Sequence, residues 1–422
     1  MNRHDMNNME AQRCLLCKRP KCALDGCPVN TPVPECMALY REGRLEEAGR
    51  LLFENNPLSA ITSLVCDWSK FCFGHCVLNV KQVPVRWYEI EQEISGEYLK
   101  THHLERASET PLEGKSVALV GGGPVGMSTA IFLWRKGADI TIYDVNERLG
   151  GVLRYGIPDF RLDKSILEPF ERMFAEAGIR FVGNTGLGKE ITIEGLHEKY
   201  DAVMIGTGAE KAMNLEIPGE SKPLVMQALP FLKNPDAFEL GKKVIVIGGG
   251  NVAMDACRTA VRRGAETWVY YRKTFENMPA NPSEIEEAKA DGVQFRVFQA
   301  PVEVHDHSVI FRDCENVTDP QTGKIVTRII EGTDHEVECD RIILAISEKP
   351  DYSPLGRFQP ELDSWGWAVK DELHRLKIEG MDHVFTAGDF ILGPKTVVEA
   401  VVSAKRAVEG IEQYLLGART RS

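Results

Sequence analysis

Two stretches of the chain repeat one order of hydrophobic and polar positions. They are KSVALVGGGPVGMSTAIFLWRKGADITIYD (115–144) and KKVIVIGGGNVAMDACRTAVRRGAETWVYYRK (242–273). Each reads as an apolar strand, a glycine turn, an amphipathic helix and a second strand. Near the end of the chain, VFTAGDFILGPKTVVEAVVSAKRAVEGIEQYL (384–415) predicts an apolar strand, a Gly-Pro turn and a long amphipathic helix. The chain beyond about residue 110 is therefore predicted to be α/β.

The first glycine turn fits the pattern GxGxxG and predicts a dinucleotide site. Gly121 permits the tight turn, Gly123 lets the backbone approach a pyrophosphate, and Gly126 allows close helix packing. The N-terminus of the helix then faces the phosphates. Asp144 lies 23 residues after Gly121, where a carboxylate can accept hydrogen bonds from ribose hydroxyls. Strand, helix and acid occur together, which favours this interpretation over an ordinary glycine-rich turn.

The second turn is a GxGxxA variant. Its residues are Gly248, Gly250, Asn251, Val252 and Ala253. Counting 23 residues from Gly248 leads to Tyr271, which is followed by Arg272 and Lys273, so the acid of the first unit is missing here. An acid would repel a 2′-phosphate, whereas these two cations would bind it, so NADP is favoured over NAD. The alternative is a pair of solvated basic residues after a strand.

Cysteines are concentrated in the first 76 residues, which hold eight of the eleven. The eight are Cys14, Cys17, Cys22, Cys27, Cys36, Cys66, Cys72 and Cys76. This asymmetry marks a separate N-terminal module. Iron–sulfur cubanes need four thiolates each, and a tight cysteine run that ends in Cys-Pro is typical of two-cluster ferredoxins. Zinc would show repeated CxxC or Cys/His pairs, and disulfides are disfavoured in a reducing compartment, so both remain as weaker alternatives.

Composition narrows the remaining choices. The chain has 422 residues, 43% hydrophobic, and a formal net charge of −12 with pI near 5.5. No basic patch runs along a helix, so a nucleic-acid partner is not expected. The start of the chain lacks the apolar region of a signal peptide, and no stretch is long enough to span a bilayer. We therefore expect a cytoplasmic protein without membrane contact.

Several motifs together resemble the glutamate synthase small-subunit family of flavoproteins. These motifs are GGGPVG, LRYGIPDFRL, GGGNVAMD, and AGD before GPKTVVEA. The family includes the NADPH-side portion of dihydropyrimidine dehydrogenase and the larger subunit of ferredoxin:NADP transhydrogenases. The resemblance implies an N-terminal all-α iron–sulfur domain followed by two nested Rossmann-like domains, as in disulfide reductases. The implied bounds are 1–110 for two [4Fe-4S] clusters, 111–236 and 350–422 for FAD, and 237–349 for NADP(H).

The resemblance also implies which residues bind the nucleotides. For FAD they are Gly121, Gly123, Gly126, Asp144, Gly151, Gly208, Gly388, Asp389, Thr396 and Val397. For NADP they are Gly248, Gly250, Asn251, Val252, Arg272 and Lys273. The helix after GPKTVVEA would aim its positive end at the edge of the flavin where negative charge gathers on reduction. No side chain is expected to act as a nucleophile or other catalytic group.

If the two cysteine groups interleave as in the family, they form two ligand sets. The first is Cys14, Cys17, Cys22 and Cys76, and the second is Cys27, Cys66, Cys72 and Glu91. Cys36 and Gln92 are rivals of Glu91 for the last position, although Cys36 lies in an apolar helical pattern that predicts a core residue. This chain departs from its relatives at Trp87 and Tyr88, where a small, flexible pair is usual.

The implied function is an electron-transfer enzyme. NADPH would deliver a hydride to FAD, which would pass single electrons through the clusters to a partner subunit or a ferredoxin in a hetero-oligomer. Reverse flow from ferredoxin to NADP⁺, or a role in an electron-bifurcating transhydrogenase, is the close alternative. A non-catalytic redox or zinc sensor and an autonomous small-molecule reductase are the other classes. Thioredoxin reductase chemistry is disfavoured because Cys257 has no partner cysteine two or three residues away.

Overall fold

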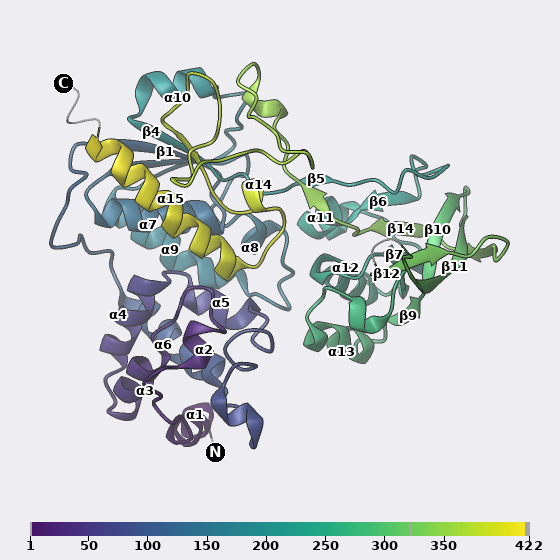
Figure 1. Cartoon of the computed structure of the whole chain (residues 1–422), viewed down its shortest axis with the longest axis horizontal. Coiled ribbons are helices and arrows are strands. Elements are labelled where there is room, and N and C mark those ends of the chain that lie inside the picture. Colours follow the sequence, from purple (N-terminus) through teal and green to yellow (C-terminus); the bar gives the residue numbers. More distant parts are fainter. Residues whose placement is uncertain (1, 321–322, 418–422) are drawn as a thin grey trace. The chain divides into compact units, whose positions relative to one another are not determined.

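The computed structural model describes residues 2–320 and 323–417, which form two compact units (Figure 1). The first comprises the chain up to Arg154, Asp159–Ala209 and the chain from Pro350 onward. The second comprises Tyr155–Pro158 and Glu210–Lys349. The predicted NADP(H)-binding region, 237–349, lies within the second unit. Strand β6, at residues 225–227, also pairs with a strand of this unit.

The first unit starts with a helical region, drawn in purple and blue in Figure 1. Its elements are α1 (Arg3–Gln12), α2 (Lys21–Leu24), α3 (Val33–Arg41), α4 (Leu45–Asn55), α5 (Ser59–Val65), the 3₁₀ helix η1 (Val77–Val80) and α6 (Trp87–Thr101). Helix α6 packs against α1, α4 and α5. Met37, Leu52, Ile90 and Ile94 are buried in the shared core. The prediction of an all-α N-terminal region is confirmed.

A parallel sheet in the order β16-β4-β1-β2-β3 forms the rest of the first unit. Its strands are β1 (Ser116–Val120), β2 (Asp139–Tyr143), β3 (Arg180–Val182), β4 (Ala202–Ile205) and β16 (Val384–Thr386). The apolar side chains of β1 and β4 are buried, as expected for inner strands of a sheet covered on both faces. Strand β16 joins this sheet only after the chain has passed through the second unit. The second unit is thus inserted into the first, as predicted.

The helices that accompany this sheet are mostly short, apart from α7, α9 and α15. They are α7 (Pro124–Arg135), α8 (Val152–Tyr155), η2 (Lys164–Leu167), α9 (Glu168–Ala177), α10 (Ile193–Lys199), η5 (Ser353–Leu355), α14 (Asp389–Leu392) and α15 (Val397–Gly417). Helix α15, yellow in Figure 1, packs along α7 and also contacts α5 of the helical region. It therefore connects the sheet to the cysteine-bearing helices.

The second unit contains another parallel sheet, in the order β6-β14-β7-β8-β9. Its strands are β6 (Val225–Gln227), β7 (Lys243–Ile247), β8 (Glu266–Tyr271), β9 (Gln294–Val297) and β14 (Arg341–Leu344). Its helices are α11 (Ala228–Lys233), η3 (Pro235–Ala237), α12 (Asn251–Arg262), η4 (Phe275–Asn277) and α13 (Pro282–Ala290). Antiparallel strands complete the unit: β10 (Gln299–Val304), β11 (Ser308–Thr318), β12 (Ile325–Ile329) and β13 (His335–Glu338), with the short pair β5 (Lys211–Ala212) and β15 (Glu348–Lys349).

The two parallel sheets share one construction. In each, a central strand leads through a glycine turn into a helix, β1 into α7 and β7 into α12. The predicted fold, a helical domain followed by two nested Rossmann-like domains, is confirmed. Within the described part of the chain, no helix combines the length and the apolar character needed to cross a bilayer.

Candidate functional site

The loops around α2 and the start of η1 bring four thiols together. They are Cys14, Cys17, Cys22 and Cys76. Burial raises the pKa of Cys22 to about 12, with smaller contributions from the other three thiols. The guanidinium of Arg41 donates hydrogen bonds to the carbonyls of Ala11, at 2.6 Å, and Cys14, at 2.5 Å. This contact holds the turn between α1 and the first two cysteines.

Three further thiols gather around a carboxyl group on α6. They belong to Cys27, Cys66 and Cys72, and each interacts electrostatically with Glu91. Burial raises the pKa of Cys66 and of Cys72 well above the usual value for a thiol. Burial also raises the pKa of Glu91 to about 8, because the side chain is only 8% exposed. The hydroxyl of Thr31 lies 3.1 Å from Cys27 Sγ.

The two thiol sets are neighbours. Cys72 of the second set interacts electrostatically with Cys22 of the first. A narrow cavity beside the first set is lined by Cys14, Cys17, Cys22, Cys72 and Cys76 together with Lys21 and apolar residues that include Val33, Met37 and Trp87. Apart from Lys21, the cavity wall consists mainly of sulfur and hydrocarbon groups, which would limit the access of water to any group bound there.

The chemistry of these donors fits iron–sulfur clusters. Thiolates and carboxylates are costly to bury as anions unless a cation compensates them. Glu91 forms no ion pair with any residue in the described part of the chain. Iron would supply the missing positive charge, since a coordinating thiol is deprotonated by the metal. Across residues 2–320 and 323–417, no three His, Cys, Asp or Glu side chains are grouped as ligands of a single metal ion. All eleven cysteines are free thiols.

The two rivals of Glu91 make other contacts. Cys36 is fully buried in the helical core, where its thiol donates to the carbonyl of Ala48 at 3.8 Å and also interacts electrostatically with Glu91. The amide oxygen of Gln92 accepts a hydrogen bond from Arg3 near the N-terminus of the chain. Glu91 is the member of this trio that the structure places against all three thiols of the second set.

Aromatic side chains that were not predicted to meet form a cluster in this region. The rings of Trp68 and Tyr88 stack at 4.5 Å between centroids, with an interplanar angle of 10°. Phe73 contacts both of them edge-on, at 5.3 and 6.1 Å. Tyr88 interacts electrostatically with Cys72. The unusual Trp87–Tyr88 pair thus packs one ring into the core and the other against the cysteine-bearing loop.

The first glycine loop is closed by backbone contacts that only glycine permits. A Cβ on Gly121, whose φ is +111°, would lie 2.4 Å from the carbonyl oxygen of Gly206. One on Gly126 would lie 1.9 Å from the carbonyl oxygen of Gly121. Asp144 lies beside the loop, where one carboxylate oxygen accepts from the Gly122 N–H at 2.6 Å. Its other oxygen accepts from the backbone and side-chain nitrogens of Asn146, a residue that the sequence analysis did not single out.

The other glycines predicted for FAD lie at the same edge of the first sheet. Gly208 follows β4 and Gly388 follows β16, and these two strands are neighbours in the sheet. Both glycines have positive φ, +78° and +67°. Gly151 approaches the first loop so closely that its Cβ would lie 2.7 Å from the Cα of Gly123. The carboxyl ends of parallel strands are where α/β folds bind their ligands.

The N-terminus of α15 is held by a capping box. Thr396 and Glu399 bond reciprocally: the Glu399 carboxylate accepts from Thr396 N at 2.9 Å, and the Thr396 hydroxyl accepts from Glu399 N at 3.3 Å. The first N–H groups of the helix, on Val397 and Val398, have no intrahelical acceptor and remain as donors at its positive end. Asp389 lies nearby, and its carboxylate accepts from Lys395 N at 3.1 Å.

The second glycine loop repeats the close backbone contacts of the first loop, but a different side chain lies beside it. Gly248 has φ of +148°, and a Cβ there would lie 2.1 Å from the carbonyl oxygen of Ala345. Gly250 is the N-cap of α12, and the side chain of Asn251 accepts from Asn281 N at 2.9 Å. Val252 packs against the core of the unit. These contacts explain why the loop tolerates few side chains.

At the second loop, the ring of Tyr271 lies where the Asp144 carboxylate lies at the first loop. A Cβ on Gly249 would lie 2.7 Å from the ring of Tyr271, just as a Cβ on Gly122 would lie 3.2 Å from the Asp144 carboxylate. Arg272 and Lys273 follow directly, at the end of β8. Within residues 2–320 and 323–417, neither forms an ion pair with a carboxylate. Both cations are therefore available to an anionic ligand.

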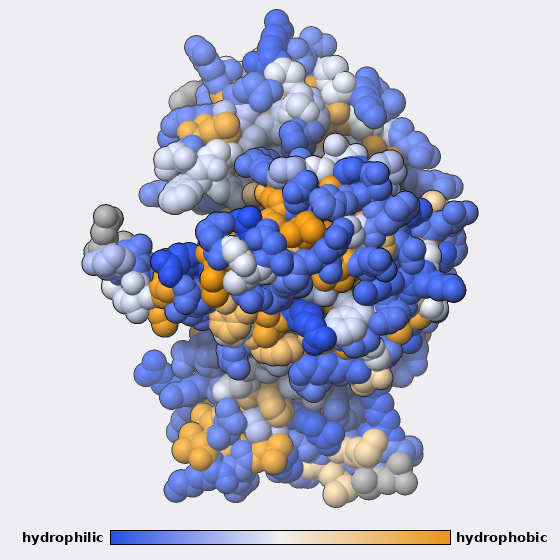
Figure 2. Space-filling model, turned by 90° about the vertical axis from the view of Figure 1, so that its right-hand side faces the viewer, coloured by the Kyte–Doolittle hydropathy of each residue, from blue (hydrophilic) through white to orange (hydrophobic). Residues whose placement is uncertain are grey.

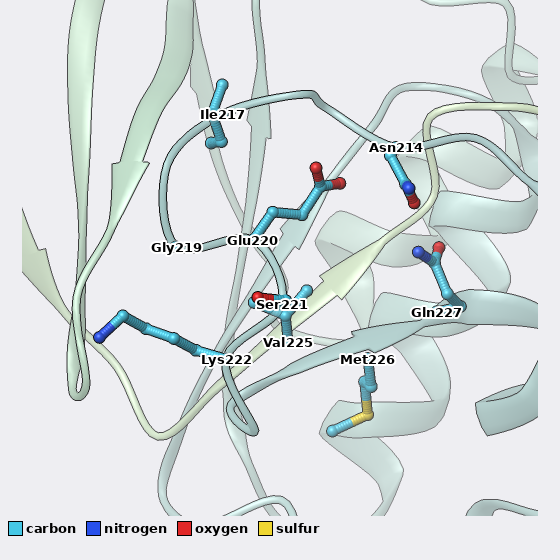
Figure 3. A pocket seen from close by; sticks show the side chains of 9 residues that line it. All are labelled: Asn214, Ile217, Gly219, Glu220, Ser221, Lys222, Val225, Met226 and Gln227. Atoms are coloured by element: carbon cyan, nitrogen blue, oxygen red, sulfur yellow. The ribbon is translucent and has the colours of Figure 1, made fainter.

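A larger cavity lies at the edge strand β6 of the second unit (Figure 3). It measures about 470 Å³ and is lined by Asn214, Ile217, Gly219, Glu220, Ser221, Lys222, Val225, Met226 and Gln227. The Glu220 carboxylate already accepts from the N–H groups of Leu215 and Glu216. Lys222 extends away from the carboxylate in Figure 3 and pairs with Asp306. None of these residues was predicted as a site residue.

Two protein families match this chain. The pyridine nucleotide-disulphide oxidoreductase family matches residues 115–404, and dihydropyrimidine dehydrogenase domain II, described as a 4Fe-4S cluster domain, matches residues 2–103. The glutamate synthase [NADPH] small chain of Azospirillum brasilense is 32% identical over 429 residues, which cover 96% of this chain and 89% of the relative. The same subunit of Escherichia coli is also 32% identical, over 96% of this chain and 91% of its own length.

Solved structures share the fold of the α/β part. FprA of Mycobacterium tuberculosis in complex with NADPH superposes with a TM-score of 0.63 at 20% identity, over 72% of this chain and 86% of FprA. Thioredoxin reductase of T. acidophilum gives a TM-score of 0.52 at 20% identity, over 71% of this chain and 98% of that structure. These similarities bear on the fold of the α/β part alone.

Proposed function

Because the chain belongs to the glutamate synthase small-subunit family of NADPH-dependent flavin oxidoreductases, we propose that it carries electrons from NADPH through FAD and two [4Fe-4S] clusters. The acceptor in this proposal is a partner subunit or a ferredoxin. The chain is an oxidoreductase, and its named relatives are small subunits of larger enzymes. The number of clusters, their ligands and the direction of flow are parts of the proposal.

The observation that carries the proposal is the pair of half-buried candidate ligand sets in the helical region. Four thiols form the first set, and three thiols with Glu91 form the second. A cubane with four protein ligands fits each set, and the apolar walls around Met37 and Trp87 would keep water away from it. Two adjacent clusters would provide a path for single electrons through the helical region.

The edge of the first sheet supports FAD binding. The loop at Gly121–Gly126 would receive the pyrophosphate, and Asp144, fixed by Gly122 and Asn146, would accept from the ribose hydroxyls. The N–H groups at the start of α15 would face the part of the ring that becomes negative. Bound FAD takes up a hydride from the nicotinamide and gives up the electrons one at a time. The chain's own groups orient the cofactor and stabilise its charge.

The second loop supports a preference for NADPH. Arg272 and Lys273 would bind the 2′-phosphate by charge-assisted hydrogen bonds, and Tyr271 removes the acid that would repel it. A guanidinium can bind a phosphate through two parallel N–H donors, which adds geometric selectivity.

The surface near the first thiol set is suited to a protein partner. Leu15, Val80 and Val83 are 63%, 82% and 65% exposed. Four exposed cations lie close to them along the chain: Lys18, Arg19, Lys21 and Lys81, which we call the basic rim. None of the four forms an ion pair within the described part of the chain. Figure 2 shows that hydrophobic side chains reach the otherwise hydrophilic surface in patches. Such a surface fits an acidic redox partner that docks beside the first cluster.

Anaerobic reconstitution with iron, sulfide and FAD, followed by titration with either nucleotide, tests this function. We expect NADPH to bleach the flavin band at lower concentrations than NADH does, and we expect steady reduction of a one-electron dye. Bleaching by NADH but not by NADPH would refute the nucleotide assignment. Rapid bleaching by NADPH without dye turnover would instead indicate a sensor.

A further inference from the structure

Helix α15 carries a lysine toward the second thiol set. The helix starts at Val397, at the proposed flavin, and Lys405 lies eight residues farther along. At a rise of about 1.5 Å per residue, this places Lys405 about 12 Å from the N-terminus of the helix. The same helix contacts α5, which ends immediately before Cys66. One rigid element therefore extends from the flavin site to the cysteine-bearing region.

A chain of hydrogen bonds links Lys405 to the loop that carries Cys27. The ammonium group donates to the side-chain oxygen of Asn55 at 2.7 Å. The amide nitrogen of Asn55 donates in turn to the carbonyl of Asn30 at 3.1 Å, and Asn30 N donates to the carbonyl of Cys27 at 2.9 Å. The contacts join α15, the end of α4 and the Cys27 loop. They fix the position of the ammonium group relative to that loop.

Lys405 interacts electrostatically with Cys27 and, to a lesser extent, with Glu409 on its own helix. Within residues 2–320 and 323–417, Lys405 forms no ion pair. Its ammonium lies 5.9 Å from the ring centroid of Phe132 and interacts electrostatically with Cys27. Glu409, one turn farther along α15, is exposed to solvent. Burial lowers the pKa of Lys405, which shows that the position costs free energy unless a negative charge compensates it.

We propose that Lys405 stabilises the reduced form of the second cluster by its positive charge and thereby raises the reduction potential of that cluster. The inference rests on the proposed function, because it requires a cluster bound to Cys27. One electron leaves the reduced flavin and enters the cluster, which becomes more negative by one unit, and no bond is formed or broken. A fixed cation in surroundings of low dielectric favours the more negative state. Lys405 is thus a positioning residue and not a catalytic group: its charge would favour the state in which the electron has moved from the flavin to the cluster.

Neutral and charged substitutions separate this role from a structural one. Lys405→Gln can still donate to Asn55 but lacks the charge, Lys405→Met lacks both, and Lys405→Arg keeps the charge. Each variant is reconstituted anaerobically as the holoprotein, and both cluster potentials are measured by redox titration followed by electron paramagnetic resonance. Lys100→Met is the matched control, because Lys100 is exposed on α6 and, among the described residues, pairs only with Glu97.

We expect Lys405→Gln and Lys405→Met to lower the reduction potential of the second cluster by about 59 mV. At a given solution potential, this shift lowers the ratio of reduced to oxidised cluster about tenfold. The first cluster serves as an internal reference and should keep its potential. Lys405→Arg and Lys100→Met should resemble the wild type. Unchanged potentials in the Gln variant, or equal shifts of both clusters, would overturn the inference while leaving the proposed function intact. A wild-type protein without clusters would overturn both.

Discussion

At the scale of single residues, Glu91 is the proposed fourth ligand of the proposed second cluster. It is buried against three thiols, and no cation among the described residues pairs with it. Glu91→Ala removes one of four ligands, so we expect the reconstituted protein to lose the second cluster, with iron falling from about eight to about four per chain. Glu91→Cys offers a thiolate at the same position and should keep iron near the wild-type content. Iron and sulfide analysis measures both variants.

Cys36→Ala is the matched control for this prediction. The Cys36 thiol donates to a backbone carbonyl in the core, so its removal should leave the iron content unchanged. The cost should be limited to stability, about 1 kcal/mol for a small buried side chain. Loss of one cluster in Cys36→Ala with retention of both in Glu91→Ala would reverse the assignment.

A separate prediction concerns Arg272 and Lys273 and the preference for NADPH over NADH. Charge-assisted hydrogen bonds contribute about 1.5–3 kcal/mol each, so the double variant Arg272→Ala/Lys273→Ala should raise KM for NADPH about 100-fold or more. KM for NADH should change little, because NADH has no 2′-phosphate. Lys289→Ala, an exposed lysine paired with Glu286 in the same unit, is the control. Equal losses for both nucleotides would contradict the assignment.

Some site residues could be predicted from the sequence, and others could not. Cysteines and glycines that follow a motif can be found because chemistry or backbone geometry restricts the residue type, as at Gly126 and Cys76. Asn146, Tyr88 and Lys405 could not be found in this way. Each acts through a neighbour that only the folded chain provides: the Asp144 carboxylate, the Trp68 ring and the Asn55 amide.

The first glycine turn sets the geometry of the FAD site at the scale of elements. A Cβ on Gly126 would meet the carbonyl of Gly121 at 1.9 Å, so Gly126→Ala must displace β1 from α7. We expect a destabilisation of about 1–3 kcal/mol and loss of FAD from the purified protein. Flavin absorbance and thermal unfolding measure the two effects.

Gly96 provides a contrasting glycine in a helix. It lies inside α6, and a Cβ there would meet nothing within 4 Å. Gly96→Ala should therefore stabilise the protein by about 0.5–1 kcal/mol and leave flavin content unchanged. If both substitutions had the same effect on flavin content, close packing at the loop would not be the reason for Gly126.

Strands with continuous apolar runs were easier to predict than the edges of the domains. The runs before Gly121 and Gly248 form β1 and β7, the central strands of their sheets. Strands β5 and β6 of the second unit were not apparent, because they are only two and three residues long. Short strands owe their pairing to tertiary contacts and leave little periodicity in the sequence.

At the scale of the whole molecule, charge is distributed unevenly. The chain has a net charge of −12, yet residues 11–24 contain four basic residues and no acidic ones. If an acidic carrier docks at the basic rim, Lys18→Gln/Arg19→Gln should slow its reduction about tenfold at low ionic strength. The effect should fade as salt is added.

A small dye controls for the electron pathway itself. The double rim variant should reduce the dye at the wild-type rate, since no docking is needed. Lys349→Gln, an exposed lysine in the second unit, should affect neither acceptor. Equal slowing of the carrier and the dye would place the effect inside the protein and not at its surface.

The central claim is that the helical region holds two cubanes which receive electrons from NADPH through FAD. The most direct test combines iron and sulfide analysis of the anaerobically prepared protein with electron paramagnetic resonance after addition of NADPH. We expect about eight iron and eight sulfide per chain. We also expect the signals of the reduced clusters to appear once the flavin is reduced. A protein that stays free of iron and sulfide after reconstitution would contradict this proposal. So would clusters that stay oxidised when NADPH bleaches the flavin, although a low-potential chemical reductant can reduce them.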